Sequence, residues 1–137
     1  MNKMKICKKE IITKNQKVYD IEVENSHHYI LNNNIISHNS LYPQDIMGGG
    51  CLVDGTNIQL ADGSLKNISE IEVGDSVMTM NGNHSVLQTH DFDDKELYEI
   101  EFEDGYVVKC SADHKFLVDE EWIRAENIFK DNIVEVD

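Results

Sequence analysis

Residues 51–79 read CLVDGTNIQLADGSLKNISEIEVGDSVMT, and this stretch decides the fold class. Short apolar runs at Ile58–Ala61 and Ser76–Met80 alternate with the turn dipeptides Asp54-Gly55 and Asp62-Gly63. Asp-Gly tolerates the positive φ of a tight hairpin turn. Strands this short, with turns this frequent, are typical of all-β domains, so we expect an all-β fold.

The same pattern continues to the end of the chain. Further turns are expected at Val73-Gly74-Asp75, Asn81-Gly82 and Asp104-Gly105. The predicted strands that follow are Ser85–Thr89, Leu97–Glu103, Tyr106–Cys110 and Lys115–Val118. Only Lys66–Ile71 and Ile123–Phe129 could each form a short helix, and Trp122 is expected to anchor the core or its rim.

Two other parts precede this region. Residues 1–39 hold two alternating, strand-like runs, Lys17–Val23 and Tyr29–Ile36. Residues 40–50, SLYPQDIMGGG, contain the single proline of the chain and end in three glycines, which is typical of a linker.

Composition excludes several classes of protein. The net charge of −14 argues against a nucleic-acid binder, which needs a basic face. The early lysines leave two readings open, a solvated surface or an attraction between a basic first segment and an acidic last one. The chain has no apolar run of the roughly 18 residues that span a bilayer and no signal peptide, so no membrane partner is expected.

The cysteines are Cys7, Cys51 and Cys110, an odd number without a C-x-x-C spacing. This argues against a disulfide framework or a structural zinc site, and no metal or cofactor is expected. We expect reduced thiols, a cytoplasmic location and a monomer. A free nucleophile therefore remains possible.

The triplet His38-Asn39-Ser40 can support cleavage of its own backbone. An asparagine side-chain amide can attack its backbone carbonyl, giving a succinimide and breaking the bond that follows. The neighbouring histidine can act as general acid, and Ser40 places a hydroxyl nucleophile directly after the bond. Alone, the triplet is a common polar turn.

Cys51 begins the last region, directly after Gly50. Its thiol can attack the Gly50 carbonyl and convert that peptide bond into a thioester, provided that the bond is distorted or polarised. In Ser111-Ala112-Asp113-His114, a serine three residues before a histidine can hold a backbone amide while the imidazole protonates the leaving nitrogen. Taken singly, a buried structural cysteine and a surface turn are the more ordinary interpretations.

Asp20 is the remaining candidate, an acid inside the alternating run Val18–Val23. An inward-facing acid in a strand serves as a proton carrier or is well paired, whereas an outward-facing one is ordinary. His27 and His28 follow this run and precede Tyr29.

Together these pieces resemble the sequence blocks of inteins, the self-splicing domains of the Hint superfamily. CLVDGTNIQLADGSLKNISEIEVGDSVMT is similar to the N-terminal block, GYVVKCSADHKFLV to the second block, and VYDIEVENSHHYILNNNIISHN to the two C-terminal blocks. The resemblance implies a horseshoe-like Hint fold of minimal size, in which Cys51 and Asn39 meet near the centre on adjacent strands. Ser111 stands where many members have threonine, and His28 where asparagine is usual.

The order of the blocks departs from the family. The C-terminal fragment (1–39) precedes the N-terminal fragment (51–137), as in a split intein whose halves are fused in reverse, with the natural break expected between Asp137 and Met1. The two fragments are each other's partners and are expected to form one domain. SLYPQDIM resembles a motif of family B DNA polymerases, which suggests a polymerase as the native extein, and Gly48–Gly50 look like an introduced spacer.

The resemblance implies autocatalytic splicing without a cofactor. Cys51, aided by Ser111 and His114, forms a thioester; Ser40 takes over the acyl group with Asp20 as proton carrier; Asn39 cyclises with help from His38 and His27. Here the product would be a ring of residues 40–50. Two alternatives stay open: a stalled, inert fusion that only holds the fragments together for structural study, and a Hint-type domain that cleaves without ligating.

Overall fold

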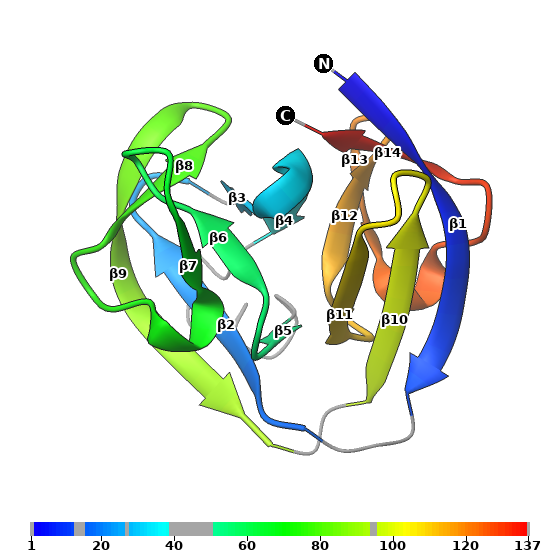
Figure 1. Cartoon of the computed structure of the whole chain (residues 1–137), viewed down its shortest axis with the longest axis horizontal. Helices are drawn as coiled ribbons and strands as arrows, with labels where there is room; N and C mark the ends of the chain where they lie inside the picture. Colours follow the sequence, from blue (N-terminus) through cyan, green and yellow to red (C-terminus); the bar gives the residue numbers. More distant parts are fainter. Residues whose placement is uncertain (1, 13–15, 27, 39–50, 94–95, 137) are drawn as a thin grey trace.

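The computed structural model describes residues 2–12, 16–26, 28–38, 51–93 and 96–136, and over these residues the fold is all-β (Figure 1). The strands are β1 (Asn2–Ile12), β2 (Val18–Val23), β3 (His28–Ile30), β4 (Ile36–His38), β5 (Leu52–Val53), β6 (Asn57–Gln59), β7 (Leu65–Asn67), β8 (Ser76–Thr79), β9 (Gly82–Phe92), β10 (Leu97–Phe102), β11 (Val107–Ser111), β12 (Lys115–Val118), β13 (Glu121–Arg124) and β14 (Ile133–Val136). Single 3₁₀ turns lie at η1 (Asn32–Asn34), η3 (Ile68–Glu70) and η4 (Ala125–Asn127). Within the described ranges, no helix is long and apolar enough to cross a membrane.

One eight-stranded antiparallel sheet organises the molecule, in the order β14-β1-β10-β11-β5-β2-β9-β8. Three two-stranded pairs, β12–β13, β3–β4 and β6–β7, complete it. In Figure 1 the strands form two arms that converge at the bottom of the view, and the β3–β4 pair lies between the arms at the top. The shortest strand of this sheet is β5, which has two residues and begins directly after Cys51.

The segments before and after the linker are interleaved in this sheet. β1 lies between β14 and β10, and β2 lies between β5 and β9, so each has neighbours only from residues 51–136. The main core cluster mixes the two segments in the same way, with Ile6, Ile21 and Tyr29 packed among residues that include Phe102 and Phe116. Because the apolar faces of β1 and β2 are buried by the later segment, neither segment has a complete core of its own.

The predicted single strand Tyr29–Ile36 is wrong. It is a hairpin of β3 and β4, interrupted by η1, where Asn33 and Asn34 have φ values of 61° and 63°. Asparagine tolerates this left-handed conformation better than other non-glycine residues, and it reverses the chain. The change places His28 opposite His38 on adjacent strands.

The two predicted helices are reduced to single turns. Ile68–Glu70 and Ala125–Asn127 lie within the predicted segments, but β7 and β13 take up the residues before them. Their i→i+3 hydrogen bonds, Ile71 N–H to the Ile68 carbonyl and Ile128 N–H to the Ala125 carbonyl, are each 3.3 Å long and do not extend further. Hairpin pairing of β7 with β6 and of β13 with β12 therefore prevails over local helix propensity.

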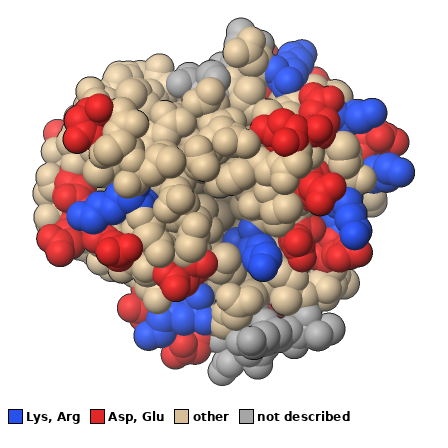
Figure 2. Space-filling model, in the orientation of Figure 1, with Lys and Arg blue, Asp and Glu red and all other residues tan. Residues whose placement is uncertain are grey.

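Charged side chains of both signs are mixed over the right-hand side of Figure 2. Lys5 reaches Asp131 at 3.8 Å across the two segments, whereas Lys8 pairs with Glu10 on its own strand at 3.1 Å. These side chains are largely exposed, so solvent screens the pairs and they contribute little to association of the segments.

Candidate functional site

Cys51 directly precedes β5, the strand that lies between β11 and β2 in the sheet. The registers pair Cys110 of β11 with Leu52, and Tyr19 of β2 with the same Leu52. One residue further along each register, Ser111 and Asp20 flank Cys51 on its two sides, and the Ser111 N–H donates to the Cys51 carbonyl at 2.9 Å. Side chains that lie opposite one another across a sheet share a face, so Ser111, Cys51 and Asp20 form one row. All three are buried, each 1% exposed.

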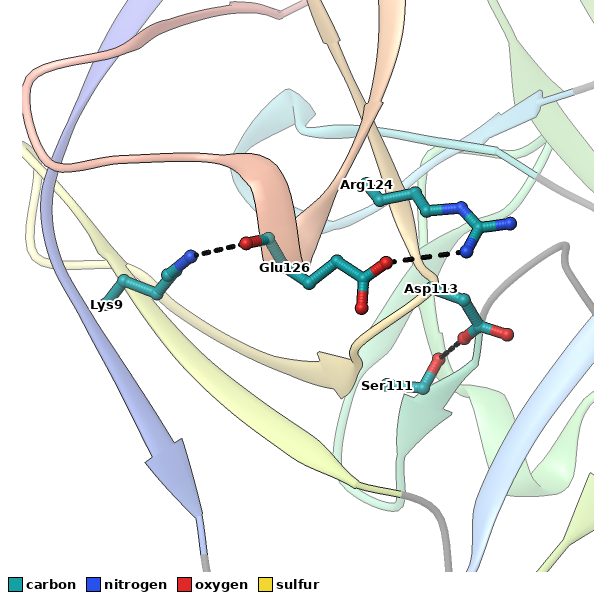
Figure 3. A network of polar contacts seen from close by, with 5 residues as sticks. All are labelled: Lys9, Ser111, Asp113, Arg124 and Glu126. Carbon is teal, nitrogen blue, oxygen red and sulfur yellow. Dashed lines mark hydrogen bonds and ion pairs between the residues drawn. The ribbon is translucent and has the colours of Figure 1, made fainter.

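The amide of Cys51 is held by Ser111. The Cys51 N–H donates to Ser111 Oγ at 2.8 Å, and Ser111 Oγ donates to Asp113 Oδ1 at 2.5 Å (Figure 3). This N–H belongs to the peptide bond between Gly50 and Cys51. A hydroxyl that donates to a carboxylate becomes a better acceptor, so Asp113 strengthens the hold on that bond. It is the contact expected for a serine in this position of the sequence.

His114 is fully buried at the end of the same loop. Burial, and to a lesser extent the nearby His38, lower its pKa to about 3 against a smaller opposing effect of Asp113, so the ring is neutral at neutral pH. Its Nε2 lies 3.3 Å from Ser37 Oγ of β4, while its Nδ1 has no hydrogen-bond partner among the described residues. A neutral imidazole with an unused nitrogen can accept a proton and pass it on.

The backbone of the Ser111–His114 loop is fixed at both ends. The His114 N–H donates to the Ser111 carbonyl at 3.1 Å, which closes the turn. Its own carbonyl accepts the Ala125 N–H at 2.6 Å, and the Ala112 carbonyl accepts the Glu126 N–H at 3.0 Å. The loop is thereby tied to η4.

The other end of the linker follows β4. His38 lies edge-on to the ring of Trp122, with centroids 5.0 Å apart. Both side chains line a cavity of about 470 Å³ together with His28, Met80 and Leu117. Trp122 is half-buried at this rim, and the residue after His38 is Asn39.

His28 has a structural role in this region. Its Nε2 accepts the Met80 N–H at 2.9 Å, and its Nδ1 lies 3.4 Å from Ser26 Oγ. Ser26 Oγ in turn donates to the His28 carbonyl at 2.9 Å and accepts the His28 N–H at 3.2 Å. Because Nε2 is used as an acceptor, the proton is on Nδ1, and protonating Nε2 would break the bond to Met80.

Asp20 is buried and faces inward, as expected of an acid in a strand that carries protons or is well paired. It lies on β2 opposite His90 of β9 and next to the buried Tyr29. The pKa of Tyr29 is raised well above its usual value by burial and then by the charge of Asp20. His90 itself lies 3.6 Å from Glu22, which shares the face of Asp20.

Models of known families and curated proteins were both compared with this chain. Neither comparison gives a match. The functional assignment therefore depends on the geometry of the residues and on their sequence pattern.

Of the candidate residues, the structure brings Cys51, Ser111 and Asp20 into one row, with His114 at the end of the same loop as Ser111. His38 lies near His114, close enough to lower its pKa. The candidates His27, Asn39 and Ser40 lie outside the described residues. Cys110 faces the main core with Leu52, on the opposite side of the sheet from Cys51.

Sequence reasoning missed three side chains: Asp113, Ser37 and Tyr29. Asp113 had a usable signal, since it lies between the serine and the histidine of one motif. Ser37 and Tyr29 had none, because only the β3–β4 hairpin brings them to the site. Among the described residues, no three His, Cys, Asp or Glu side chains gather as a metal ion would require.

Proposed function

We propose that this chain is a self-splicing domain of the intein type, which excises residues 40–50 and closes them into a ring. The observation that carries the proposal is the hydrogen bond of 2.8 Å from the N–H of the Gly50–Cys51 bond to Ser111 Oγ. A buried N–H needs an acceptor in any fold, but a serine that holds this amide, donates to Asp113 and lies on one loop with a buried neutral histidine is also suited to activate the bond.

The first step is an acyl shift at Cys51. Its Sγ attacks the carbonyl carbon of Gly50, the bond from that carbon to the Cys51 nitrogen breaks, and a thioester remains. His114 accepts the thiol proton and returns it to the leaving nitrogen. Ser111 and Asp113 keep the amide in the orientation that lets its nitrogen be protonated.

The later steps follow from the resemblance to inteins. Ser40 Oγ attacks the thioester and forms an ester, and the thiolate of Cys51 takes a proton, with Asp20 as carrier. The Asn39 amide nitrogen then attacks its own carbonyl carbon, which forms a succinimide and releases the Ser40 amine. Attack of this amine on the ester gives the peptide bond of the ring, and His38 assists the cyclisation of Asn39.

The reversed layout is also compatible with this fold. Asn2 of β1 lies opposite Val136 of β14, so the two ends of the chain are neighbours on antiparallel strands. A hairpin connection could join such ends, as it would in a domain whose segments run in the usual order. This favours a domain in which residues 51–137 originally preceded residues 1–39.

Intact-mass measurement of the purified chain at neutral pH with thiol tests the proposal. We expect the full-length mass to give way to residues 51–137, to residues 1–39 ending in a succinimide or its hydrolysis product, and to cyclic SLYPQDIMGGG. The double variant Cys51→Ala, Asn39→Ala should keep the full-length mass. A wild-type chain that stays intact after long incubation would overturn the proposal and leave an inert fusion, whereas a linear peptide alone would indicate cleavage without ligation.

A further inference from the structure

Lys9 of β1 reaches across the molecule to η4. Its Nζ donates to the carbonyl oxygen of Glu126 at 3.1 Å, as Figure 3 shows. It also donates to the carbonyl oxygen of Ala125 at 3.2 Å. The same ammonium group lies over the rings of Tyr98 and Phe129, 5.1 and 5.5 Å from their centroids. The cation is thus held between two carbonyls and two rings, a geometry with more directional constraint than an exposed ion pair.

One of the two peptide units that Lys9 contacts also holds the Ser111–His114 loop. The Ala125 carbonyl belongs to the same peptide unit as the Glu126 N–H, which donates to the Ala112 carbonyl at 3.0 Å. A cation on the carbonyl polarises that unit and strengthens the bond from its N–H. Ala112 stands between Ser111 and Asp113, whose side chains hold the Cys51 amide.

We propose that Lys9 is a positioning residue for the acyl shift at Cys51. Through η4, Lys9 stabilises the loop that contains Ser111, Asp113 and His114. Activation of the Gly50–Cys51 bond then depends on the pairing of β1 with the rest of the sheet. The inference rests on the proposed splicing function. In this proposal, residues 1–39 supply more than the groups that react at their own junction. Through Lys9 they also influence the rate of the acyl shift at Cys51.

The neighbouring Lys8 provides a matched control. It lies on the same strand, carries the same charge and is more exposed than Lys9, and it pairs only with Glu10 at 3.1 Å among the contacts of the described residues. Lys9→Met keeps the apolar stem and removes the three N–H donors, whereas Lys9→Arg keeps donors and charge.

The reaction test separates the two junctions. In an Asn39→Ala, Ser40→Ala background, thiol cleavage at Gly50–Cys51 reports the acyl shift alone; in a Cys51→Ala background, cleavage after Asn39 reports cyclisation alone. We expect Lys9→Met to slow the first by about tenfold or more and to leave the second within about twofold. Lys9→Arg should recover most of the loss, and Lys8→Met should change neither rate. Equal slowing of both reactions by Lys9→Met would show a general loss of structure and overturn the inference.

A second measurement does not depend on activity. In the inactive Cys51→Ala, Asn39→Ala chain, amide hydrogen exchange followed by NMR should be faster at Glu126 and at residue 51 when Lys9 is methionine. The Val86 amide, bonded to the Asp75 carbonyl in the other arm at 2.8 Å, should be unaffected. Unchanged exchange at Glu126 would overturn the role of Lys9 even in a chain that splices. A wild-type chain that never cleaves would overturn splicing instead, while the exchange measurement still decides whether Lys9 orders the loop.

Discussion

The two ends of the linker are built differently. Around Cys51, Ser111 and Asp113 form a chain of short hydrogen bonds of 2.8 and 2.5 Å. Around His38, the side chains line a cavity of about 470 Å³ with an aromatic wall. An acyl shift needs one peptide bond held in a fixed orientation, whereas cyclisation of Asn39 needs room for a side chain to turn onto its own carbonyl. Under the proposed function, the contrast corresponds to two kinds of reaction: an acyl shift that depends on a fixed orientation of the peptide bond, and a cyclisation that depends on space for the side chain to turn.

Removing the hydroxyl of Ser111 is expected to have the largest effect. Ser111→Ala leaves the Cys51 N–H without its acceptor, and we expect thiol cleavage at Gly50–Cys51 to fall by about 10²–10³-fold, as when one preorganised polar contact is lost from an active site. Cleavage after Asn39, measured with Cys51→Ala, should persist. Intact-mass kinetics measure both rates.

Ser111→Thr is the matched control, because it keeps the hydroxyl and adds only a methyl group. It should retain cleavage within about tenfold of wild type. If Ser111→Ala slowed both junctions equally, the two ends of the linker would not be independent and the contrast drawn above would be wrong.

Buried His114 makes stability depend on pH. Its pKa is about 3 in the folded chain and about 6.5 when unfolded, so between pH 6.5 and 5 only the unfolded state gains this proton. The free energy of unfolding should therefore fall by about 1.6 kcal/mol over that interval, with a slope that approaches about 1.4 kcal/mol per pH unit toward pH 5.

Urea titrations of the inactive Cys51→Ala, Asn39→Ala chain at several pH values measure this dependence. In the same background, His114→Gln should remove this contribution of His114 to the pH dependence of the free energy of unfolding. The other histidines are common to both chains and cancel in the comparison. Identical slopes would mean that His114 is charged in the folded state and would contradict its role as proton acceptor.

Much of the fold and half of the site could be predicted from the sequence. Turns such as Asn81-Gly82 and Asp104-Gly105 are local, and both glycines have positive φ, 100° and 88°, where a tight hairpin requires it. The all-β class follows from them. Ser111 and Cys51 could be singled out because each stands in a block that resembles those of inteins, although the contact between them joins residues 60 positions apart.

The rest depends on contacts between distant parts of the chain. β1 reads NKMKICKKEII, without clean alternation, and is a strand because β14 and β10 supply partners on both sides. Ser37 reaches His114 from 77 positions away in the sequence. Neither contact leaves a local pattern, so neither could be found without the register of the sheet.

The role of His28 can be tested at the second junction. His28→Leu leaves the part-buried Met80 N–H without its acceptor, which should cost about 1 kcal/mol, the low end of the range for an unpaired donor. We expect a loss of this size in the free energy of unfolding of the inactive chain, with thiol cleavage at Gly50–Cys51 unchanged in the active one. His84→Leu is the matched control, because the Nε2 of this half-buried histidine has no hydrogen-bond partner among the described residues. A small loss for His28→Leu, with slower cleavage after Asn39, would instead make His28 part of the chemistry.

The smallest effect is expected at Tyr29, which pairs with Ser37 across the β3–β4 hairpin and feels the charge of Asp20. Its hydroxyl is fully buried and makes no hydrogen bond of good geometry with the described residues, although Ser37 is close enough to lower its pKa against the larger effect of burial. Removing a buried hydroxyl whose one polar contact, with Ser37, has poor geometry costs little, so Tyr29→Phe should change the free energy of unfolding by less than about 0.5 kcal/mol.

A double-mutant cycle with Ser37→Ala makes this test decisive. Ser37 already contacts His114 at 3.3 Å, and the charge of Asp20 acts on Tyr29. A coupling energy near zero between Tyr29→Phe and Ser37→Ala would mean that no polar chain links the Asp20 side of the site with the His114 side. A coupling of about 1 kcal/mol or more would place a hydrogen bond between Tyr29 and Ser37. Protons could then pass from one junction to the other through side chains, and the two ends of the linker would have to be described as one site.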